Sequence, residues 1–194
     1  MNRGENEKMI KDYGFKPTPV DESKNIEDYT KKEAKLMFEW YLDDLPKRTE
    51  YLFDYINETD DIPMEFTFET FKKVVDWLAK TLRIIYKTPE EKAEQRRNTP
   101  EYAWDYLDDW RFSEDSELII TAVGGYLGMV MVNEIPGAKW VLDTYKRSVS
   151  YNNAVIKKDT GGHLEPVMIT DVISSKLVDQ DEVGIDSMIE SWKR

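Results

Sequence analysis

The long apolar segment at residues 118–135 restricts the possible folds of this chain more than any other feature of the sequence. Ser113 supplies an N-cap a few residues before it, and its length and composition are typical of a helix that is buried on all sides. The segment contains Gly124, Gly125 and Gly128, and a glycine costs about 1 kcal/mol relative to alanine inside a helix. We therefore predict a central buried helix whose glycine face is approached closely by another part of the chain.

An amphipathic helix is predicted near the start of the domain. Thr30 and Glu33 have the spacing of a capping box, and apolar residues then recur every three or four positions across residues 34–45. Pro46 is expected to break or kink this helix because proline lacks the amide hydrogen that the helix needs. The pattern resumes at residues 51–56, which predicts a short second helix.

Three further helical segments are predicted before the central helix. Residues 68–85 form the cleanest amphipathic pattern in the chain. Thr88 opens a short polar helix over residues 89–98, with a first-turn proline and a glutamate placed to complete a capping box. Pro100 begins another helical stretch, in which aromatic side chains alternate with acidic ones.

The pattern changes after the central helix to that of short strands. Residues 140–145 and 154–158 read as two strands separated by turn residues. Residues 166–178 are expected to supply a third strand near 167–169 and then a helix, and residues 185–192 a terminal helix. The order of elements predicts an α+β fold, with a mainly helical N-terminal half packed with the central helix and a small antiparallel sheet.

The chain is expected to contain one domain and an N-terminal arm. Residues 1–29 have several glycines and prolines and no sustained periodicity, so we predict an irregular arm that Tyr13, Phe15 and Val20 attach to the domain. Residues 30–194 are predicted to form a single α+β domain, because a chain with 40% hydrophobic residues has enough apolar surface for one core.

Composition excludes several functional classes. The chain has no cysteine and a single histidine, His163, which excludes disulfides, thiolate nucleophiles, zinc fingers and any site with two imidazoles. A net charge of −12 repels nucleic acids, so a basic protein is the expected partner. The first residues lack an apolar signal segment, and we find no apolar run of about 18 to 20 residues. These features predict a cytoplasmic protein without a membrane partner.

The negative charge is concentrated in two stretches. Residues 99–117 contain seven acidic side chains against the single Arg111, and residues 171–190 have an excess of five negative charges. The first stretch also carries tyrosines and tryptophans, which frequently anchor protein interfaces, while its acids would steer a basic partner toward it. The candidate partner-binding residues are Tyr102, Asp105, Tyr106, Asp108, Asp109, Glu114 and Asp115.

A structural interpretation of the same stretch competes with the binding face. Trp104, Leu107 and Trp110 are spaced by three and would form one buried stripe of a helix, leaving the acids on its solvated side. The two interpretations are compatible if Tyr102 and Tyr106 are exposed.

Catalytic and metal sites receive little support from the sequence. Asp105, Asp108 and Asp109 would share one helical face and could converge on a hard cation, but no companion motif supports a site there. Residues 124–128 resemble a phosphate-binding loop only in their glycines, and packing explains them better. His163 follows two glycines and is interpreted as a turn residue. We therefore predict no catalytic residue, no bound metal and no cofactor.

Two parts of the chain resemble a group of small, acidic, uncharacterised bacterial proteins that are often suspected to be immunity partners of secreted toxins. The first is residues 30–52, with Glu-Ala-Lys-Leu-Met-Phe-Glu-Trp-Tyr followed by Pro-Lys-Arg. The second comprises residues 125–130, 138–140 and 153–156, which are similar to the helix-to-strand core of that group. Met129 departs from the pattern, since relatives typically have an acidic residue there. The shared motifs are structural, so the resemblance transfers no catalytic residue.

These observations favour a non-enzymatic protein-binding protein, in the form of an immunity protein that neutralises a basic toxin through an acidic, aromatic face. A small carboxylate- or metal-dependent hydrolase and a structural subunit of a larger assembly are the alternatives.

Overall fold

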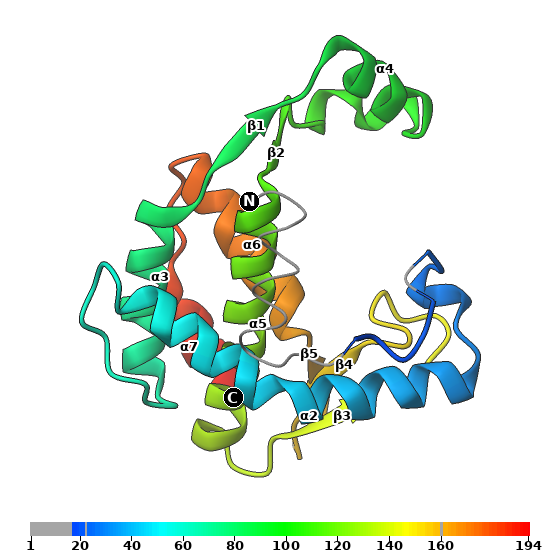
Figure 1. Cartoon of the computed structure of the whole chain (residues 1–194). Helices are drawn as coiled ribbons and strands as arrows, with labels where there is room; N and C mark the ends of the chain where they lie inside the picture. Colours follow the sequence, from blue (N-terminus) through cyan, green and yellow to red (C-terminus); the bar gives the residue numbers. More distant parts are fainter. Residues whose placement is uncertain (1–16, 22, 160) are drawn as a thin grey trace.

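Helix α5 (Glu114–Glu134) forms the centre of the structure, and most of the helices and strands outside residues 84–112 lie around it (Figure 1). The computed structural model describes residues 17–21, 23–159 and 161–194, and it confirms the predicted α+β class. In chain order the remaining elements are the 3₁₀ helix η1 (Ile26–Asp28), α2 (Lys31–Ile56), α3 (Phe68–Thr81), β1 (Ile84–Tyr86), α4 (Pro89–Arg97), the 3₁₀ helix η2 (Glu101–Tyr106), β2 (Trp110–Phe112), β3 (Lys139–Leu142), β4 (Ala154–Lys157), β5 (His163–Leu164), α6 (Pro166–Val178) and α7 (Ile185–Lys193).

The glycines of α5 allow three neighbours to approach its backbone, which confirms the predicted close contact. A Cβ atom on Gly124 would lie 2.7 Å from the Cα atom of Val167 in α6. A Cβ atom on Gly128 would overlap the indole ring of Trp140 in β3, and Gly125 lies against α2. These contacts compensate for the low helix propensity of glycine, because a larger residue would push the neighbours away.

Helix α2 continues through Pro46, so the predicted break at this residue was wrong. Pro46 is exposed, whereas the adjacent Leu45 and the later Leu52 are buried in the face of α2 that packs on α5. Burial on both sides of the proline offsets the loss of one helical hydrogen bond, a cost of about 3 kcal/mol. The residues predicted to form a second short helix are therefore the last turns of α2.

Both predicted capping boxes are present. The amide of Glu33 donates to Thr30 Oγ1 over 3.3 Å, and the Thr30 amide donates to Glu33 Oε2 over 2.7 Å. At α4 the Glu91 amide donates to Thr88 Oγ1 over 3.2 Å, and the Thr88 amide donates to Glu91 Oε2 over 2.7 Å. The same local motif therefore starts a long buried helix and a short exposed one.

Helix α3 ends earlier than its apolar pattern predicts. Leu82 is its C-cap and has an extended ψ of 140°, and the predicted helical residues that follow form strand β1 instead. The amide of Arg83 donates to Ser116 Oγ of α5 over 2.8 Å, which holds the chain in this extended conformation. A tertiary contact thus ends a helix that its own sequence would continue.

The strands form two antiparallel sheets, one of β1 and β2 and one with the strand order β3-β4-β5. The register pairs Trp140 with Ile156, and Ile156 is fully buried. The two strands predicted before residue 160 are confirmed. The predicted third strand near residues 167–169 was wrong, because Pro166 starts α6 and the third strand is β5.

The core joins α2, α3, β2, α5, β4, α6 and α7 in one cluster of buried apolar side chains. The largest fully buried residues are Trp77, Tyr126, Phe71, Leu52, Ile56 and Leu78. The predicted terminal helix is confirmed as α7, whose Trp192 packs near Phe68 and Phe71 of α3. Residues from both halves of the chain therefore form one core.

The N-terminal arm was predicted over residues 1–29, and residues 1–16, with Tyr13 and Phe15, lie outside the described residues. In the described part, Val20 is half-buried and η1 forms a single short turn. The side-chain amide of Asn152 donates to the carbonyl oxygens of Ile26 and Tyr29 over 2.9 and 3.3 Å. The end of the arm is thereby held by the loop between β3 and β4.

Among the described residues, α5 is the one helix that is long and apolar enough to cross a membrane by length and composition, so the expectation that the chain has no apolar run of this length was wrong. However, 61% of its most apolar window is buried inside the protein. This burial is typical of a core helix.

Candidate partner-binding lobe

Residues 84–112, termed here the hairpin lobe, project from the rest of the described structure, termed the body (Figure 1). Strands β1 and β2 form an antiparallel ribbon that pairs Ile84 with Phe112 and Tyr86 with Trp110. Beyond the ribbon, the Lys87 amide donates to the carbonyl oxygen of Asp109 over 2.8 Å. Helices α4 and η2 lie at the far end of this ribbon (Figure 1). The lobe is therefore joined to the body through two adjacent strands.

Trp104 holds the two helices of the lobe together. Its indole Nε1 lies 3.2 Å from the carbonyl oxygen of Arg96 and 3.0 Å from that of Thr99, and donates to both. The guanidinium of Arg96 stacks over the Trp104 ring at 5.8 Å from its centre. The Trp104 side chain remains 39% exposed in spite of these contacts. Trp104 is thus an anchor within the lobe and not a residue of the main core.

Four of the predicted partner-binding residues are exposed in η2 and in the turn that follows it: Tyr102, Asp105, Tyr106 and Asp108. Tyr102 and Tyr106 are each 84% exposed. The carboxylates of Asp105 and Asp108 have no hydrogen bond or ion pair within the described part of the chain. Tyr86, which the sequence interpretation missed, is a third exposed tyrosine of the lobe, at 73% exposure, and it lies in strand β1 of the ribbon.

The helical stretch predicted after Pro100 is present as the 3₁₀ helix η2, but it ends at Tyr106 and strand β2 follows it. The predicted buried stripe was wrong. Trp104, Leu107 and Trp110 consequently lie in three different local structures. Trp110 packs edge-to-face on Phe112 at 5.0 Å at the base of the ribbon, whereas Trp104 lies against α4.

Basic side chains of the lobe reduce the negative charge of this stretch. Lys92 forms an ion pair with Asp109 at 2.9 Å, and Arg111 pairs with Glu91 at 3.4 Å. The ammonium group of Lys87 donates to the carbonyl oxygen of Asp108 over 3.0 Å. The whole lobe has seven acidic and five basic side chains, a net charge of −2. Its acidity is thus local to η2 and the turn that follows.

Glu114 and Asp115 do not belong to the same surface as the tyrosines. Both lie in the first turn of α5, after the N-cap Ser113, at the base of the ribbon. Acidic side chains in a first turn interact favourably with the positive end of the helix dipole, which accounts for their position. The ribbon therefore separates them from Tyr102 in η2.

The three aspartates considered as metal ligands in the sequence do not form a metal site. Asp105 lies in η2, while Asp108 and Asp109 lie in the turn before β2, so the three do not share a helical face. In residues 17–21, 23–159 and 161–194, no group of three or more histidine or acidic side chains is placed to hold a metal ion.

A cluster around His163 was missed by the sequence interpretation. His163 is part of β5 and not a turn residue. Its Nε2 atom lies 3.4 Å from Ser148 Oγ and 3.7 Å from Asp143 Oδ2. A serine triad requires the serine and the carboxylate on opposite ring nitrogens, whereas both approach the same nitrogen here. Strand pairing creates this cluster, and residue spacing gives no sign of it.

Comparison with protein-family models, with curated proteins and with solved structures returned no match for the chain. The likeness to immunity-type bacterial proteins therefore rests on the sequence motifs alone.

Proposed function

We propose that the chain is a non-enzymatic, cytoplasmic binding protein that captures a basic polypeptide with the end of its hairpin lobe. The exposed pair Tyr102 and Tyr106, each 84% exposed beside unpaired carboxylates, carries this proposal. Tyrosine offers a large amphipathic contact surface with few rotatable bonds, which makes it a common anchor of interfaces. Burial of these two side chains against a partner would stabilise the complex.

Electrostatics supports a basic partner. Asp105 and Asp108 are exposed between and beside the tyrosines, and the protein as a whole carries a charge of −12. The overall field increases the rate of encounter with a cation-rich surface, and the two free carboxylates provide pairing groups after contact. The modest net charge of the lobe implies that aromatic burial supplies most of the affinity.

Within this class, we propose an immunity protein that neutralises a basic toxin. The sequence resemblance and the overall acidity favour this role. An immunity gene normally lies directly after its toxin gene, so the product of the gene that precedes this one is the partner to test.

The test measures binding of that gene product to the full-length chain by biolayer interferometry. The double variant Tyr102→Ala/Tyr106→Ala should raise the dissociation constant about a hundredfold or more, mainly through faster dissociation. Asp105→Lys/Asp108→Lys should slow association, and the effect should shrink at high salt.

Matched controls lie on the body. Tyr145→Ala removes a tyrosine that is 62% exposed in the β3–β4 loop, and Asp181→Lys/Glu182→Lys reverses two charges between α6 and α7. Both controls should bind as the wild type does. If the body variants lose binding and the lobe variants retain it, the assignment of the binding surface to the lobe is refuted. If the preceding gene product does not bind at all, the immunity role is refuted.

A further inference from the structure

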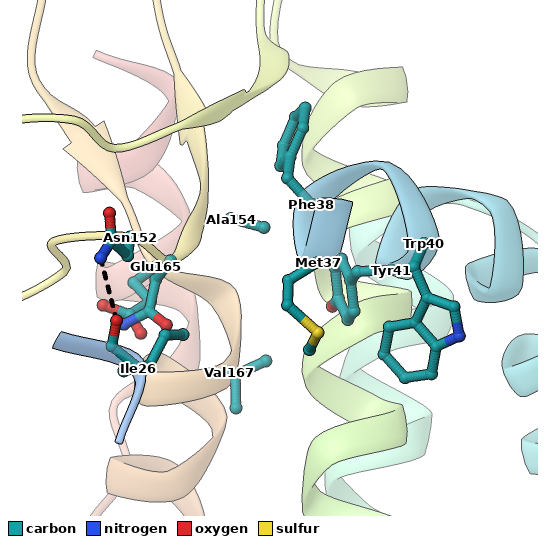
Figure 2. Close-up of a pocket in the computed structure, with 10 residues that line it drawn as sticks. Ile26, Met37, Phe38, Trp40, Tyr41, Asn152, Ala154, Glu165 and Val167 are labelled. Carbon is teal, nitrogen blue, oxygen red and sulfur yellow. Dashed lines mark hydrogen bonds between the residues drawn. The ribbon is translucent and has the colours of Figure 1, made fainter. Parts of the chain in front are cut away.

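A cavity of about 170 Å³ lies in the body, between α2, the loop before β4 and the start of α6 (Figure 2). Its apolar walls are formed by Met37 and Phe38 on one side and by Ala154 and Val167 on the other. An apolar cavity of about 150 Å³ in a protein interior is large enough for benzene. The space therefore suits one small ring and leaves no room for a peptide.

Tyr41 brings an unpaired hydroxyl to this cavity. Its Oη atom is buried and has no hydrogen-bond partner among the described residues. Burial raises the pKa of Tyr41 to about 12, so the hydroxyl is a neutral donor at physiological pH. A buried polar group without a partner is unusual in a native protein, and an occupant with an acceptor atom would satisfy it.

Glu165 lies on the opposite side of the cavity from Tyr41 (Figure 2). Its side chain is half-buried, and within the described residues its carboxylate forms no ion pair or hydrogen bond. Asn152, another wall residue, is occupied by its bonds to Ile26 and Tyr29. Glu165 is thus the charged group that is available to an occupant, and it favours a cation.

The two sides of the cavity are held on α5 by its glycines. A Cβ atom on Gly125 would lie 3.3 Å from Tyr41 Oη, and one on Gly124 would lie 2.7 Å from Val167. These short contacts fix α2 and α6 at their positions, with the cavity between them. The walls of the cavity are therefore packed on the central helix, as is usual for preformed ligand sites.

We propose that this cavity binds a small aromatic amine. The ring fills the apolar space, the ammonium group pairs with Glu165, and a polar atom on the ring accepts a hydrogen bond from Tyr41. The proposal does not depend on the function of the hairpin lobe, since none of these residues belongs to it.

Four probe compounds separate the three interactions in a calorimetric titration of the full-length protein. Tyramine has the ring, the ammonium and the ring oxygen. Phenethylamine lacks the ring oxygen, para-ethylphenol lacks the ammonium, and para-hydroxyphenylpropionate carries a carboxylate in its place. Tyramine should bind with a millimolar or lower dissociation constant, the two partial analogues about five- to tenfold more weakly, and the carboxylate most weakly.

Substitutions assign each interaction to its residue. Tyr41→Phe should reduce tyramine binding to the level of phenethylamine and leave phenethylamine unchanged. Glu165→Gln should weaken both amines by about tenfold and leave para-ethylphenol unchanged. Ala154→Leu, which fills the cavity, should weaken every probe. Tyr145→Phe is the matched control on an exposed tyrosine.

Stability without ligand provides an independent readout. Tyr41→Phe removes an unpaired buried hydroxyl, so the melting temperature should stay the same or rise. A fall of more than about 3 °C would show that the hydroxyl has a partner inside the protein, and it would overturn the proposal. Equal affinity of all four probes, or no binding of tyramine at about 10 mM, would also overturn it.

Discussion

The body and the hairpin lobe use the same kinds of side chain in opposite ways. Helix α3 buries seven of its 14 residues, whereas α4 and η2 bury none of theirs. Aromatic residues of the body, such as Phe71 and Trp77, are in the core, while Tyr102 and Tyr106 of the lobe face solvent. Burial therefore makes the body cooperative, and its absence leaves the lobe as a surface that is available for contact.

Truncation of one aromatic residue in each region should give the largest difference. Phe71→Ala removes a fully buried ring and should lower the free energy of unfolding by about 3–5 kcal/mol. Trp104→Ala should lower it by less than about 1 kcal/mol, because the hydrogen bonds and the cation–π contact of Trp104 lie within the lobe and its side chain is 39% exposed. Urea unfolding of both variants measures this difference. Equal losses would show that the lobe unfolds as part of the body.

An exchange between glycine and alanine inside a helix should affect the stability of the two regions differently. Gly128→Ala improves helix propensity by about 1 kcal/mol, yet the new methyl group overlaps Trp140, so a net loss of about 1–3 kcal/mol is expected in urea unfolding. Trp140→Leu should recover part of the loss in the double variant. Ala93→Gly, the control in α4 of the lobe, should leave global unfolding unchanged. A stabilising Gly128→Ala would contradict the packing assignment.

The two capping boxes allow the same substitution to be compared in both regions. Thr30→Ala should lower the free energy of global unfolding by about 1 kcal/mol, because α2 is part of the core. Thr88→Ala should leave global unfolding unchanged and increase hydrogen exchange of the α4 amides about fivefold. Denaturation and exchange measured on the same two proteins test both statements. A global loss from Thr88→Ala would refute the independence of the lobe.

A fall in pH should slightly lower the stability of the body through protonation of Glu33. This is the smallest of the four expected effects. Hydrogen bonds from Lys24 and Thr30 lower the pKa of Glu33 from 4.5 to about 2. Because the pKa is lowered in the folded state, its stabilising contribution is present above pH 4.5 and is lost as the pH falls toward 2.

Unfolding curves of wild type and Glu33→Gln at several pH values check this expectation. The difference between the two proteins should shrink as the pH falls through that window. Glu91→Gln is the matched control, since the pKa of Glu91 is also lowered, by its bond from Thr88, but in a helix outside the core. A pH-independent difference for Glu33→Gln would contradict the expectation.

Local signals in the sequence predicted the helices of the body well. The Thr30 capping box, the apolar periodicity of α3 and the length of α5 depend on neighbouring residues, and the structure confirms them. The errors fall where distant contacts decide. Burial of α2 on α5 carries the helix through Pro46, and Ser116 captures the amide that ends α3 at Leu82.

The candidate site was predicted less completely than the fold. Exposure of Tyr102 and Tyr106 agrees with the expectation, but the ribbon determines which charges meet. Lys92 reaches Asp109 only because β1 and β2 bring α4 and η2 together, and Glu114 is carried to the other end of the ribbon. These ion pairs cannot be predicted from the positions of the charged residues in the sequence.

The ribbon of β1 and β2 also has a consequence for how the protein can evolve. The chain leaves the body after Arg83 and returns at Ser113, whose amide donates to the Arg83 carbonyl oxygen over 3.0 Å. Phe112 of β2 belongs to the core, but residues 87–109 between the two strands can be replaced, lengthened or shortened with only a small change in loop-closure entropy, while the packing around α5 stays as it is. Selection for a new partner can therefore act on this segment without a compensating change in the core.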